Sequence, residues 1–365
     1  MLIDIATASP PYKVMQKKAT EELKKRMEGR PAIARLIDSA STHSGIETRY
    51  FVVPDGIDSA EDKFFSKDGN YIRPGTKSRM MEYERWSNKL TLEAAQKVLS
   101  DNAINPETIG RLITISCTGF FAPGLDYHLI NKLKLPGNIK RTQIGFMGCA
   151  ASLIGFNSVL EAINSTRDGE EINLLLVSVE LCSLHLQTEP TKDNILANMI
   201  FADGAAAALF SNSPSLKSKA SLNIISTRSI LFEDSAEFMG WKIGDFGFEM
   251  LLSSELPKII FEQAVPALKE IFDNMGIKKE EIKHWALHPG GRAILDSLQQ
   301  GLELTDEEMK PSRDVLKNFG NMSSASILFV LKEILQTRTI NQNDLCCAVA
   351  FGPGLSMEVA LLNGV

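Results

Sequence analysis

The chain is poor in cysteine and has no Cys-x-x-Cys pair. Its 365 residues include five cysteines, at positions 117, 149, 182, 346 and 347. An odd number of cysteines without that spacing indicates neither a disulfide framework nor a zinc site. We therefore expect free thiols and no bound metal in a soluble cytoplasmic protein.

Long apolar runs and a surplus of positive charge are also missing. No uncharged apolar run reaches the ~20 residues of a membrane-spanning helix, and Asp4 interrupts the apolar start, unlike a secretory signal. Lys and Arg number 39 against 45 Asp and Glu, and the net charge of −6 opposes binding to nucleic acid or acidic membranes. Within Lys13–Arg30, basic residues mix with Glu at helical spacing, which predicts a solvated helix face.

What is present is the composition of an ordinary globular protein with a large core, 44% hydrophobic and 23% charged. The segments NLLLVSVEL, at 173–181, and CCAVAF, at 346–351, are nearly continuous apolar runs. Such runs are typical of strands buried on both faces. Because they alternate with amphipathic helices, we expect an α/β protein with mixed central sheets.

Two parts of the chain share a pattern in the same order. Ile104–Gly119 and Ile277–Gly291 both read I-x-x-E-x-I before an apolar strand. GCAASLIGF, from Gly148, and GNMSSASIL, from Gly320, both place a polar residue and small residues before an apolar helix. The pattern indicates a duplicated α/β unit, with chance similarity among short segments as the alternative.

The duplication predicts two α/β halves, residues 1–212 and 213–365, because the polar, Ser-rich segment Ser211–Asn223 lies between them. Cys149 follows the start of the first repeat by 45 residues, and Asn321 follows that of the second by 44. Equivalent loops of the two halves would face each other across a pseudo-twofold axis. Cys149 would then lie near Asn321.

Cys149 follows Gly148 at the expected first turn of a helix. Unpaired backbone N–H groups and the helix dipole favour negative charge there, which stabilises the nucleophilic thiolate. Gly145 and Gly148 permit close approach of another backbone. The alternative is a small buried hydrophobe, the usual state of a free cysteine.

His288 and Asn321 are the candidate partners of this thiol. His288 ends a strand in ALHPGGRAIL, before a proline and two glycines. Asn321, in NFGNMSSAS, could cap its helix, or could donate its amide N–H to a developing oxyanion. A thiol, an imidazole and an amide together suit acyl transfer from a thioester, followed by carbon–carbon bond formation.

At these residues the sequence closely resembles the type III polyketide synthases, the chalcone synthase-like branch of the thiolase-fold condensing enzymes. The shared motifs are GFMGCAAS, FADGAAAAL, HPGGRAILD, FGNMSSAS and AFGPGLS, in the expected order between Cys117 and Ser356. The stretch ELCSLHLQ is more similar to bacterial members. The resemblance implies a thiolase-like fold of two pseudo-duplicated α/β halves, layered α/β/α/β/α.

The family's chemistry implies that Cys149 accepts a starter acyl group from a coenzyme A thioester with the help of His288. His288 and Asn321 would then stabilise the enolate from decarboxylated malonyl-CoA, which attacks the Cys149 thioester. Several rounds would precede cyclisation to a pyrone, resorcinol or phloroglucinol-type product. No metal or organic cofactor takes part in this scheme.

The resemblance also implies substrate-binding residues. Phe201 and Phe248 match two gatekeepers between the CoA tunnel and the cavity, with core packing as the alternative for each. Phe121, or its neighbour, matches a residue that enters the partner's cavity, which implies a homodimer. The remaining implied residues are Cys182, His185, Ser323, Gly352 and Pro353.

Departures from the family pattern leave other functions open. Ala350 stands before Phe351 where chalcone synthases have glycine, and the usual basic CoA contacts are missing from STHSGIETRYF. CoA could instead contact residues 61–89, within the segment Asp55–Lys89 that we expect to form an insertion or loop over the active-site side. The alternatives are a single-round ketoacyl synthase III-like enzyme that uses an acyl carrier protein, a cysteine thioesterase, and a scaffold without activity.

Overall fold

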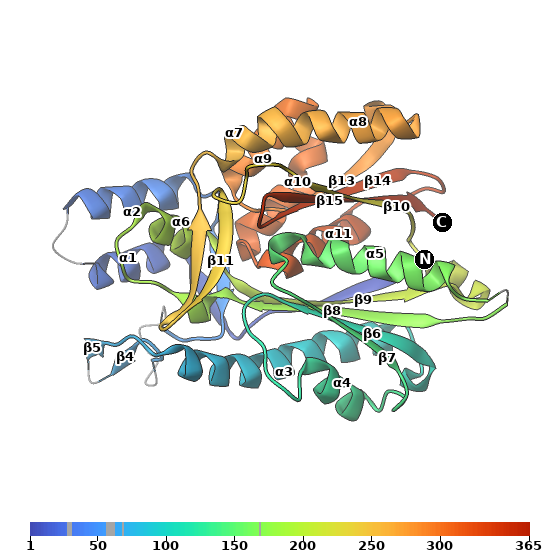
Figure 1. The fold of residues 1–365 in the computed structure, drawn as a ribbon, viewed down its shortest axis with the longest axis horizontal. Helices are drawn as coiled ribbons and strands as arrows, with labels where there is room; N and C mark the ends of the chain where they lie inside the picture. The colour runs from blue at the N-terminus through green and yellow to red at the C-terminus, as the bar shows by residue number, and fades with distance from the viewer. Residues whose placement is uncertain (28–30, 56–62, 68, 168) are drawn as a thin grey trace.

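The computed structural model describes residues 1–27, 31–55, 63–67, 69–167 and 169–365. Nine of the strands that it describes form two sheets that lie one above the other, with helices outside both and between them (Figure 1). They are hydrogen bonded in the order β13-β14-β15-β10-β1-β9-β8-β6-β7. The strands β1 and β10 are paired only at Leu2 and Leu222. This single pair connects the two sheets.

The first sheet contains five strands, with β6 parallel to β7 and β8, and β9 antiparallel to β8 and β1. Their bounds are β1 Leu2–Ala8, β6 Ile109–Ser116, β7 Lys140–Gly145, β8 Asn173–Leu181 and β9 Asp203–Ser211. In the second sheet β13 runs parallel to β14, and β15 is antiparallel to β14 and β10. Its strands are β10 Leu222–Leu231, β13 Ile282–Leu287, β14 Leu345–Gly352 and β15 Ser356–Gly364.

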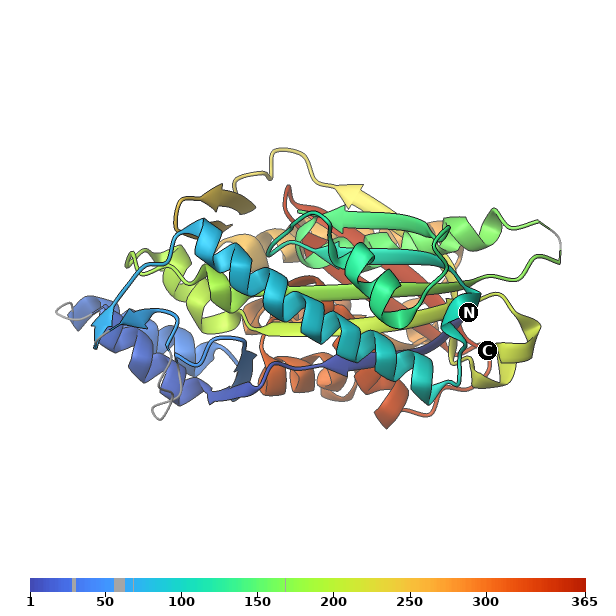
Figure 2. The ribbon, with the colours of Figure 1, turned by 90° about the horizontal axis from the view of Figure 1, so that it is seen from below.

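Helices occupy three layers around these sheets (Figures 1 and 2). The middle layer holds α5 Ala151–Asn164 and α11 Ser326–Thr337, and the layer on the first sheet holds α3 Thr76–Asp101 and α4 Leu125–Leu133. The layer on the second sheet holds α7 Leu256–Ile259, α8 Val265–Met275, α9 Arg292–Leu302 and α10 Asp306–Phe319. Three hydrophobic clusters fill the spaces between these layers. The predicted α/β/α/β/α arrangement with mixed sheets is confirmed.

One end of the molecule carries three further helices and short antiparallel hairpins (Figure 1). The helices are α1 Gln16–Arg26, α2 Pro31–His43 and α6 Lys192–Ile200. The hairpin strands are β2 Tyr12–Met15 with β3 Thr48–Phe51, β4 Ser66–Lys67 with β5 Asn70–Tyr71, and β11 Met239–Gly244 with β12 Gly247–Leu252. Among the described residues, no helix is both long enough and apolar enough to cross a membrane.

The expected repeat appears as matching elements. β6 and β13 each follow a short 3₁₀ turn, and α5 and α11 each begin after another, at Gly148–Ala150 and Ser323–Ala325. The chain passes from β9 of the first sheet to β10 of the second across the predicted boundary. Independent folding of residues 1–212 and 213–365 stays a prediction.

The prediction of an insertion or loop over Asp55–Lys89 is wrong from Thr76 on, where α3 begins; the described residues before it form the short β4–β5 hairpin and loops. The sequence pattern did not indicate this helix, because a charged residue, Arg79, occupies one of its buried positions. Arg79 lies one turn before the buried ring of Tyr83, and its guanidinium donates to the carbonyls of Leu184 and Leu186 at 2.8 and 3.0 Å. Residues 56–62 and 68 of this prediction lie outside the described residues.

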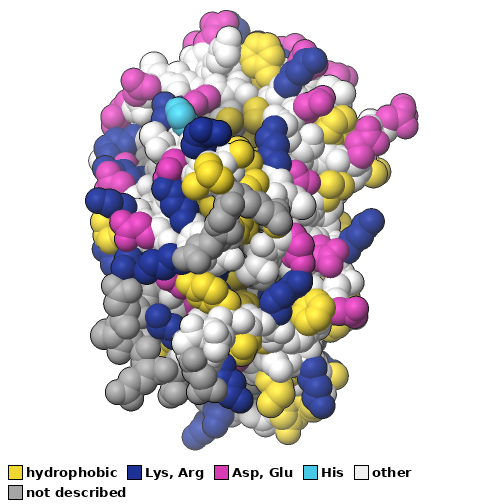
Figure 3. Space-filling model, turned by 90° about the vertical axis from the view of Figure 1, so that its left-hand side faces the viewer, with side chains coloured by type: hydrophobic (Ala, Val, Ile, Leu, Met, Phe, Trp, Pro, Cys, Tyr) yellow, Lys and Arg dark blue, Asp and Glu magenta, His cyan; other side chains and the backbone are white. Residues whose placement is uncertain are grey.

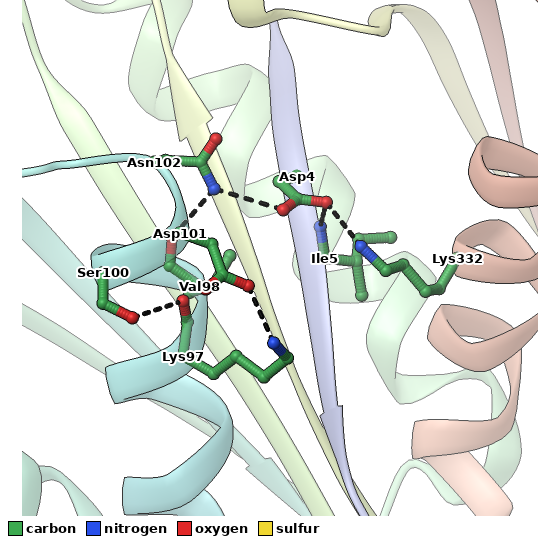
Figure 4. Close-up of polar contacts among 8 residues, drawn as sticks. All are labelled: Asp4, Ile5, Lys97, Val98, Ser100, Asp101, Asn102 and Lys332. Atoms are coloured by element: carbon green, nitrogen blue, oxygen red, sulfur yellow. Dashed lines mark hydrogen bonds and ion pairs between the residues drawn. The ribbon is translucent and has the colours of Figure 1, made fainter.

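Asp4 joins the first strand to helices of two layers (Figure 4). Its carboxylate accepts a 2.8 Å hydrogen bond from Lys332 of α11 and a 3.2 Å bond from the amide of Asn102, next to the end of α3. Asn102 also donates to the carbonyl of Val98 at 2.9 Å. The polar residue that interrupts the apolar amino terminus therefore fixes β1 between its neighbours.

A substitution at Gly301 tests how closely α9 packs within the helix layer on the second sheet. A Cβ atom at this position of α9 would lie 2.5 Å and 2.9 Å from the two methyl groups of Val265. Alanine favours a helix over glycine by up to about 1 kcal/mol, whereas overpacking costs about 1–3 kcal/mol. We predict that Gly301→Ala lowers the urea midpoint, and that Gln300→Ala at its exposed neighbour does not. An unchanged or higher midpoint for Gly301→Ala would contradict this packing.

Candidate active site

A large cavity lies where α5 begins, and three of the five cysteines line it: Cys117, Cys149 and Cys182. The empty space within it is about 1200 Å³, which includes open solvent at its mouth. Figure 3 shows the end of the molecule that carries α1 and α2, where hydrophobic side chains gather between charged groups of both signs.

Cys149 occupies the 3₁₀ turn that precedes α5, and its residue surface is 7% exposed. Gly148 has a φ of +62°, and a Cβ there would collide with the ring of Pro353. Gly352 approaches the same turn, because its own Cβ would lie 2.7 Å from the carbonyl oxygen of Met147. The absence of a side chain at Gly148 and Gly352 therefore allows the AFGPGLS turn to pack directly against the backbone next to Cys149.

Burial dominates the protonation of the thiol. It raises the pKa of Cys149 to about 11, while hydrogen bonds from the side chains of Ser323 and Asn321 act in the opposite direction. The sulfur lies 3.5 Å from the Ser323 hydroxyl. The resting residue is therefore a neutral thiol at neutral pH, and not the thiolate that the helix-start argument favours.

Asn321 lies just before the matching turn of α11. Its backbone is fixed by the N–H of Ala202, which donates to its carbonyl at 2.8 Å, and its own N–H donates to Ile200 at 2.9 Å. Its side-chain amide donates to the carbonyl of Gly290 at 3.2 Å, and its Oδ1 accepts from the N–H of Ser323 at 2.8 Å. Because Ser323 also bonds to Cys149, and the Asn321 side chain itself contacts the thiol, the predicted proximity of Asn321 to Cys149 is observed.

His288 directly follows β13 and is 2% exposed. Its backbone N–H donates to Val349 at 2.8 Å, and Asn321 holds the carbonyl of Gly290 two residues later. Neither ring nitrogen has a hydrogen-bond partner among the residues that the structure describes. Burial lowers the pKa of His288 to about 3, so the ring is a neutral imidazole with a free donor and a free acceptor.

Glu180 is a buried carboxylate beside the site that the sequence interpretation did not include. It accepts the Cys117 N–H at 3.0 Å, the Thr118 hydroxyl at 2.7 Å and the Ser324 hydroxyl. Burial raises its pKa, and its charge contributes to the raised pKa of Cys149. The signal was present in the sequence, since Glu180 is the one charged residue in NLLLVSVEL.

Six of the eight predicted substrate-binding residues line the cavity: Phe201, Phe248, Cys182, His185, Ser323 and Pro353. Gly352 supports the nucleophile's turn from behind and is not among the lining residues. Phe121, or its neighbour, was matched to the partner subunit's cavity, and this stays a prediction; within its own chain the Phe121 ring packs edge-on against Tyr83 with centroids 6.2 Å apart. Trp241 also lines the cavity and was missed, since a tertiary contact places its Nε1–H 2.7 Å from the carbonyl of Cys117.

His185 holds other residues in place and has no free nitrogen. Its Nδ1 accepts the backbone N–H of Phe248 at 2.9 Å, so Nε2 carries the proton and donates to the carbonyl of Thr118 at 2.7 Å. The ring stacks on Phe248 with centroids 4.2 Å apart. Burial lowers its pKa to about 3, so it stays neutral. Of the two histidines in this region, His288 alone has free ring nitrogens.

Known protein families match both parts of the chain. Residues 65–236 match the model of FAE1/type III polyketide synthase-like proteins, and residues 223–365 match the carboxy-terminal domain of chalcone and stilbene synthases. A Bacillus subtilis protein whose name likens it to chalcone synthase is 30% identical, over 99% of this chain and 98% of its own. The 1,3,6,8-tetrahydroxynaphthalene synthase of Streptomyces peucetius is 27% identical, over 98% and 92%.

Solved structures agree with these matches. PKS-I of the brown alga Ectocarpus siliculosus superposes with a TM-score of 0.90 at 29% identity, over 100% of this chain and 98% of that one. The tetrahydroxynaphthalene synthase of Streptomyces coelicolor gives a TM-score of 0.87 at 26% identity, over 100% and 99%. The chain therefore belongs to the type III polyketide synthases, the chalcone synthase-like condensing enzymes that form carbon–carbon bonds by acyl transfer.

Proposed function

We propose that this enzyme extends an acyl-CoA starter on Cys149 with several malonyl-CoA units and then cyclises the chain. The observation that carries the proposal is a chain of hydrogen bonds that starts at the buried Cys149 thiol in the apolar cavity. The thiol bonds to Ser323, and the N–H of Ser323 donates to the side chain of Asn321. The amide of Asn321 in turn donates to Gly290, two residues after the unpartnered imidazole of His288. The proposed product is a pyrone, resorcinol or phloroglucinol-type ring, and a relative from Mycobacterium tuberculosis, 29% identical over 98% of this chain, is named for alpha-pyrone synthesis.

Because the Cys149 thiol and the His288 imidazole are both neutral at rest, acyl transfer includes a proton transfer from sulfur to nitrogen. The free nitrogen of His288 accepts the thiol proton as the sulfur of Cys149 attacks the thioester carbonyl. A carbon–sulfur bond forms to Cys149 while the bond to CoA breaks, and the CoA sulfur leaves with the proton. No net charge enters the site, which matters because burial disfavours ionisation of both groups.

Decarboxylation of malonyl-CoA then produces an enolate that needs hydrogen-bond donors. Asn321 has two amide N–H groups, one bonded to Gly290 and one that contacts the Cys149 sulfur. The second can donate to an enolate that forms beside this sulfur, together with the ring N–H of His288. The enolate carbon attacks the Cys149 thioester, and the cysteine sulfur leaves. Loss of CO₂ drives the step, so the scheme includes no metal or organic cofactor.

Product mass tests the proposal against its alternatives. We predict that the protein incubated with ¹³C-malonyl-CoA and an acyl-CoA releases products with several labelled units each. Cys149→Ala should lower the yield by at least about 10³-fold, because the nucleophile is lost. Cys346→Ala, which removes a thiol of β14 that is not among the residues lining the cavity, should retain turnover. A single labelled unit that requires an acyl carrier protein, or release of the free starter acid, would contradict iterative extension.

The variant Asn321→Ala distinguishes a role of this amide in decarboxylation from a role in starter transfer. We predict that Asn321→Ala slows CO₂ release from malonyl-CoA by about 10²–10³-fold, the usual cost of one lost oxyanion donor. Transfer of the starter to Cys149 should fall much less, which serves as the control for correct folding. Equal losses in both steps would show that Asn321 supports the position of the thiol and not the enolate.

We also propose a homodimer. Large apolar side chains near the cavity are exposed to solvent, among them Phe120 at 47%, Met147 at 44% and Ile243 at 57%. Apolar groups gathered on one surface are typical of protein contacts. We predict a mass of about twice 40.2 kDa by light scattering, and a shift toward monomer for Phe120→Glu but not for Phe261→Glu on another surface. A monomeric parent protein would contradict the proposal.

A further inference from the structure

One wall of the cavity is a hairpin that belongs to neither large sheet. Its strands, β11 and β12, pair only with each other among the strands that the structure describes. Four of its side chains line the cavity: Met239, Trp241, Phe248 and Met250. Because no strand pairing attaches this hairpin to the sheets, other contacts have to fix its position.

Two aromatic side chains bind consecutive carbonyl groups just after β6. The Nε2–H of His185 donates to the carbonyl of Thr118 at 2.7 Å, and the Nε1–H of Trp241 donates to that of Cys117 at 2.7 Å. The Nδ1 atom of His185 also accepts the backbone N–H of Phe248, in β12, at 2.9 Å. His185 and Trp241 therefore connect the hairpin to the same short segment, Cys117–Thr118.

The side chains that make these bonds form one packed cluster of rings. The His185 ring stacks on Phe248 with centroids 4.2 Å apart and an interplanar angle of 15°. Trp241 packs edge-on against both rings, at 5.4 Å from His185 and 5.7 Å from Phe248. His185 and Phe248 are buried, so a hydrogen bond lost here is not replaced by one to water.

Other bonds hold the turn of the hairpin independently of this cluster. The Thr76 hydroxyl accepts the N–H of Gly247 at 2.9 Å, and Gln187 donates to the carbonyl of Phe248 at 3.2 Å. A substitution at His185 would therefore leave the hairpin attached at its turn. It would release the N–H of Phe248 inside the cavity wall.

The segment Cys117–Thr118 also contacts the turn of the nucleophile. The Cys117 sulfur accepts the N–H of Gly148, directly before Cys149, at 3.1 Å. Glu180 fixes the segment from another side through the Cys117 N–H and the Thr118 hydroxyl. The hairpin and the thiol are thus both placed relative to one rigid segment.

We propose that His185 and Trp241 are positioning residues that hold the β11–β12 hairpin in place relative to the Cys149 thiol and so set the affinity for the acyl-CoA starter. The inference rests on the proposed function and deepens it. A residue that only lines the cavity acts through its size, whereas His185 acts here through its two hydrogen bonds. Neither residue takes part in bond making.

Three variants at position 185 separate hydrogen bonding from size. His185→Phe keeps a ring but leaves Phe248 N–H and Thr118 C=O without this partner, whereas His185→Asn keeps an acceptor and His185→Gln keeps a donor. The rate of Cys149 acylation would be measured by intact mass against acyl-CoA concentration. The half-saturating concentration should rise about tenfold or more in His185→Phe, because two buried groups lose their partner. It should rise less in the Asn and Gln variants.

The maximal rate of acylation should change little, because the thiol and His288 stay in place. Alkylation of Cys149 by iodoacetamide, a reagent too small to need the hairpin, should be unchanged in all three variants. Lys242→Ala, at an exposed position of the same hairpin, should match the parent in every measurement. Half-saturation that is equal for the parent and His185→Phe, but worse for the Asn and Gln variants, would show that cavity shape alone matters and would overturn the inference.

Hydrogen exchange keeps the inference separate from the reaction. Amide exchange at residues 239–252 should accelerate about tenfold or more in His185→Phe and in Trp241→Phe, while exchange in α5 should stay as in the parent. A parent protein that no acyl-CoA acylates would contradict the proposed function alone, and exchange then decides the inference. Unchanged exchange in both variants would overturn it. If His185→Phe does not fold, Trp241→Phe, which loses a single hydrogen bond, still decides it.

Discussion

The site depends on the contact between the first turns of α5 and α11. The hydroxyl of Ser152 in α5 donates to the carbonyl of Ser324 at 2.6 Å, and the Ser324 hydroxyl bonds to Ser178 at 2.9 Å and to Glu180. All of these groups are buried, so leaving any one unpaired would be costly. This constraint holds the two halves in one register, and the thiol on one turn consequently lies beside the amide that precedes the other.

The same burial sets the electrostatic state of the catalytic groups. It raises the pKa of Cys149 and lowers that of His288, so the resting site holds a thiol and an imidazole instead of an ion pair. The helix start and the hydrogen bonds from Ser323 and Asn321 do not offset desolvation. Proton transfer from sulfur to nitrogen must therefore accompany attack on the thioester. In the later decarboxylation, exclusion of water from the cavity would strengthen the few hydrogen bonds available to the enolate.

The repeat and the motifs in the sequence predicted the layered fold and the meeting of Cys149 with Asn321, because duplication relates positions far apart in the chain. Predictions from local sequence patterns were wrong where a contact with a distant residue determines the position of a side chain. Arg79 concealed α3 because its guanidinium binds carbonyls of a distant segment, and Arg26, whose side chain is only 2% exposed, appeared to be solvated because its partner Asp55 is 29 residues away. Likewise, nothing in the sequence showed that both nitrogens of His185 would be engaged.

The central claim is that a buried thiol carries the acyl chain, and the mass of the intact protein tests it most directly. After incubation with an acyl-CoA alone, the account predicts a mass increase equal to one acyl group per chain, located on the peptide that contains Cys149. The adduct should disappear when malonyl-CoA is added. Acylation located on Cys117 or Cys182, or turnover without an acylated chain at any time, would contradict the account.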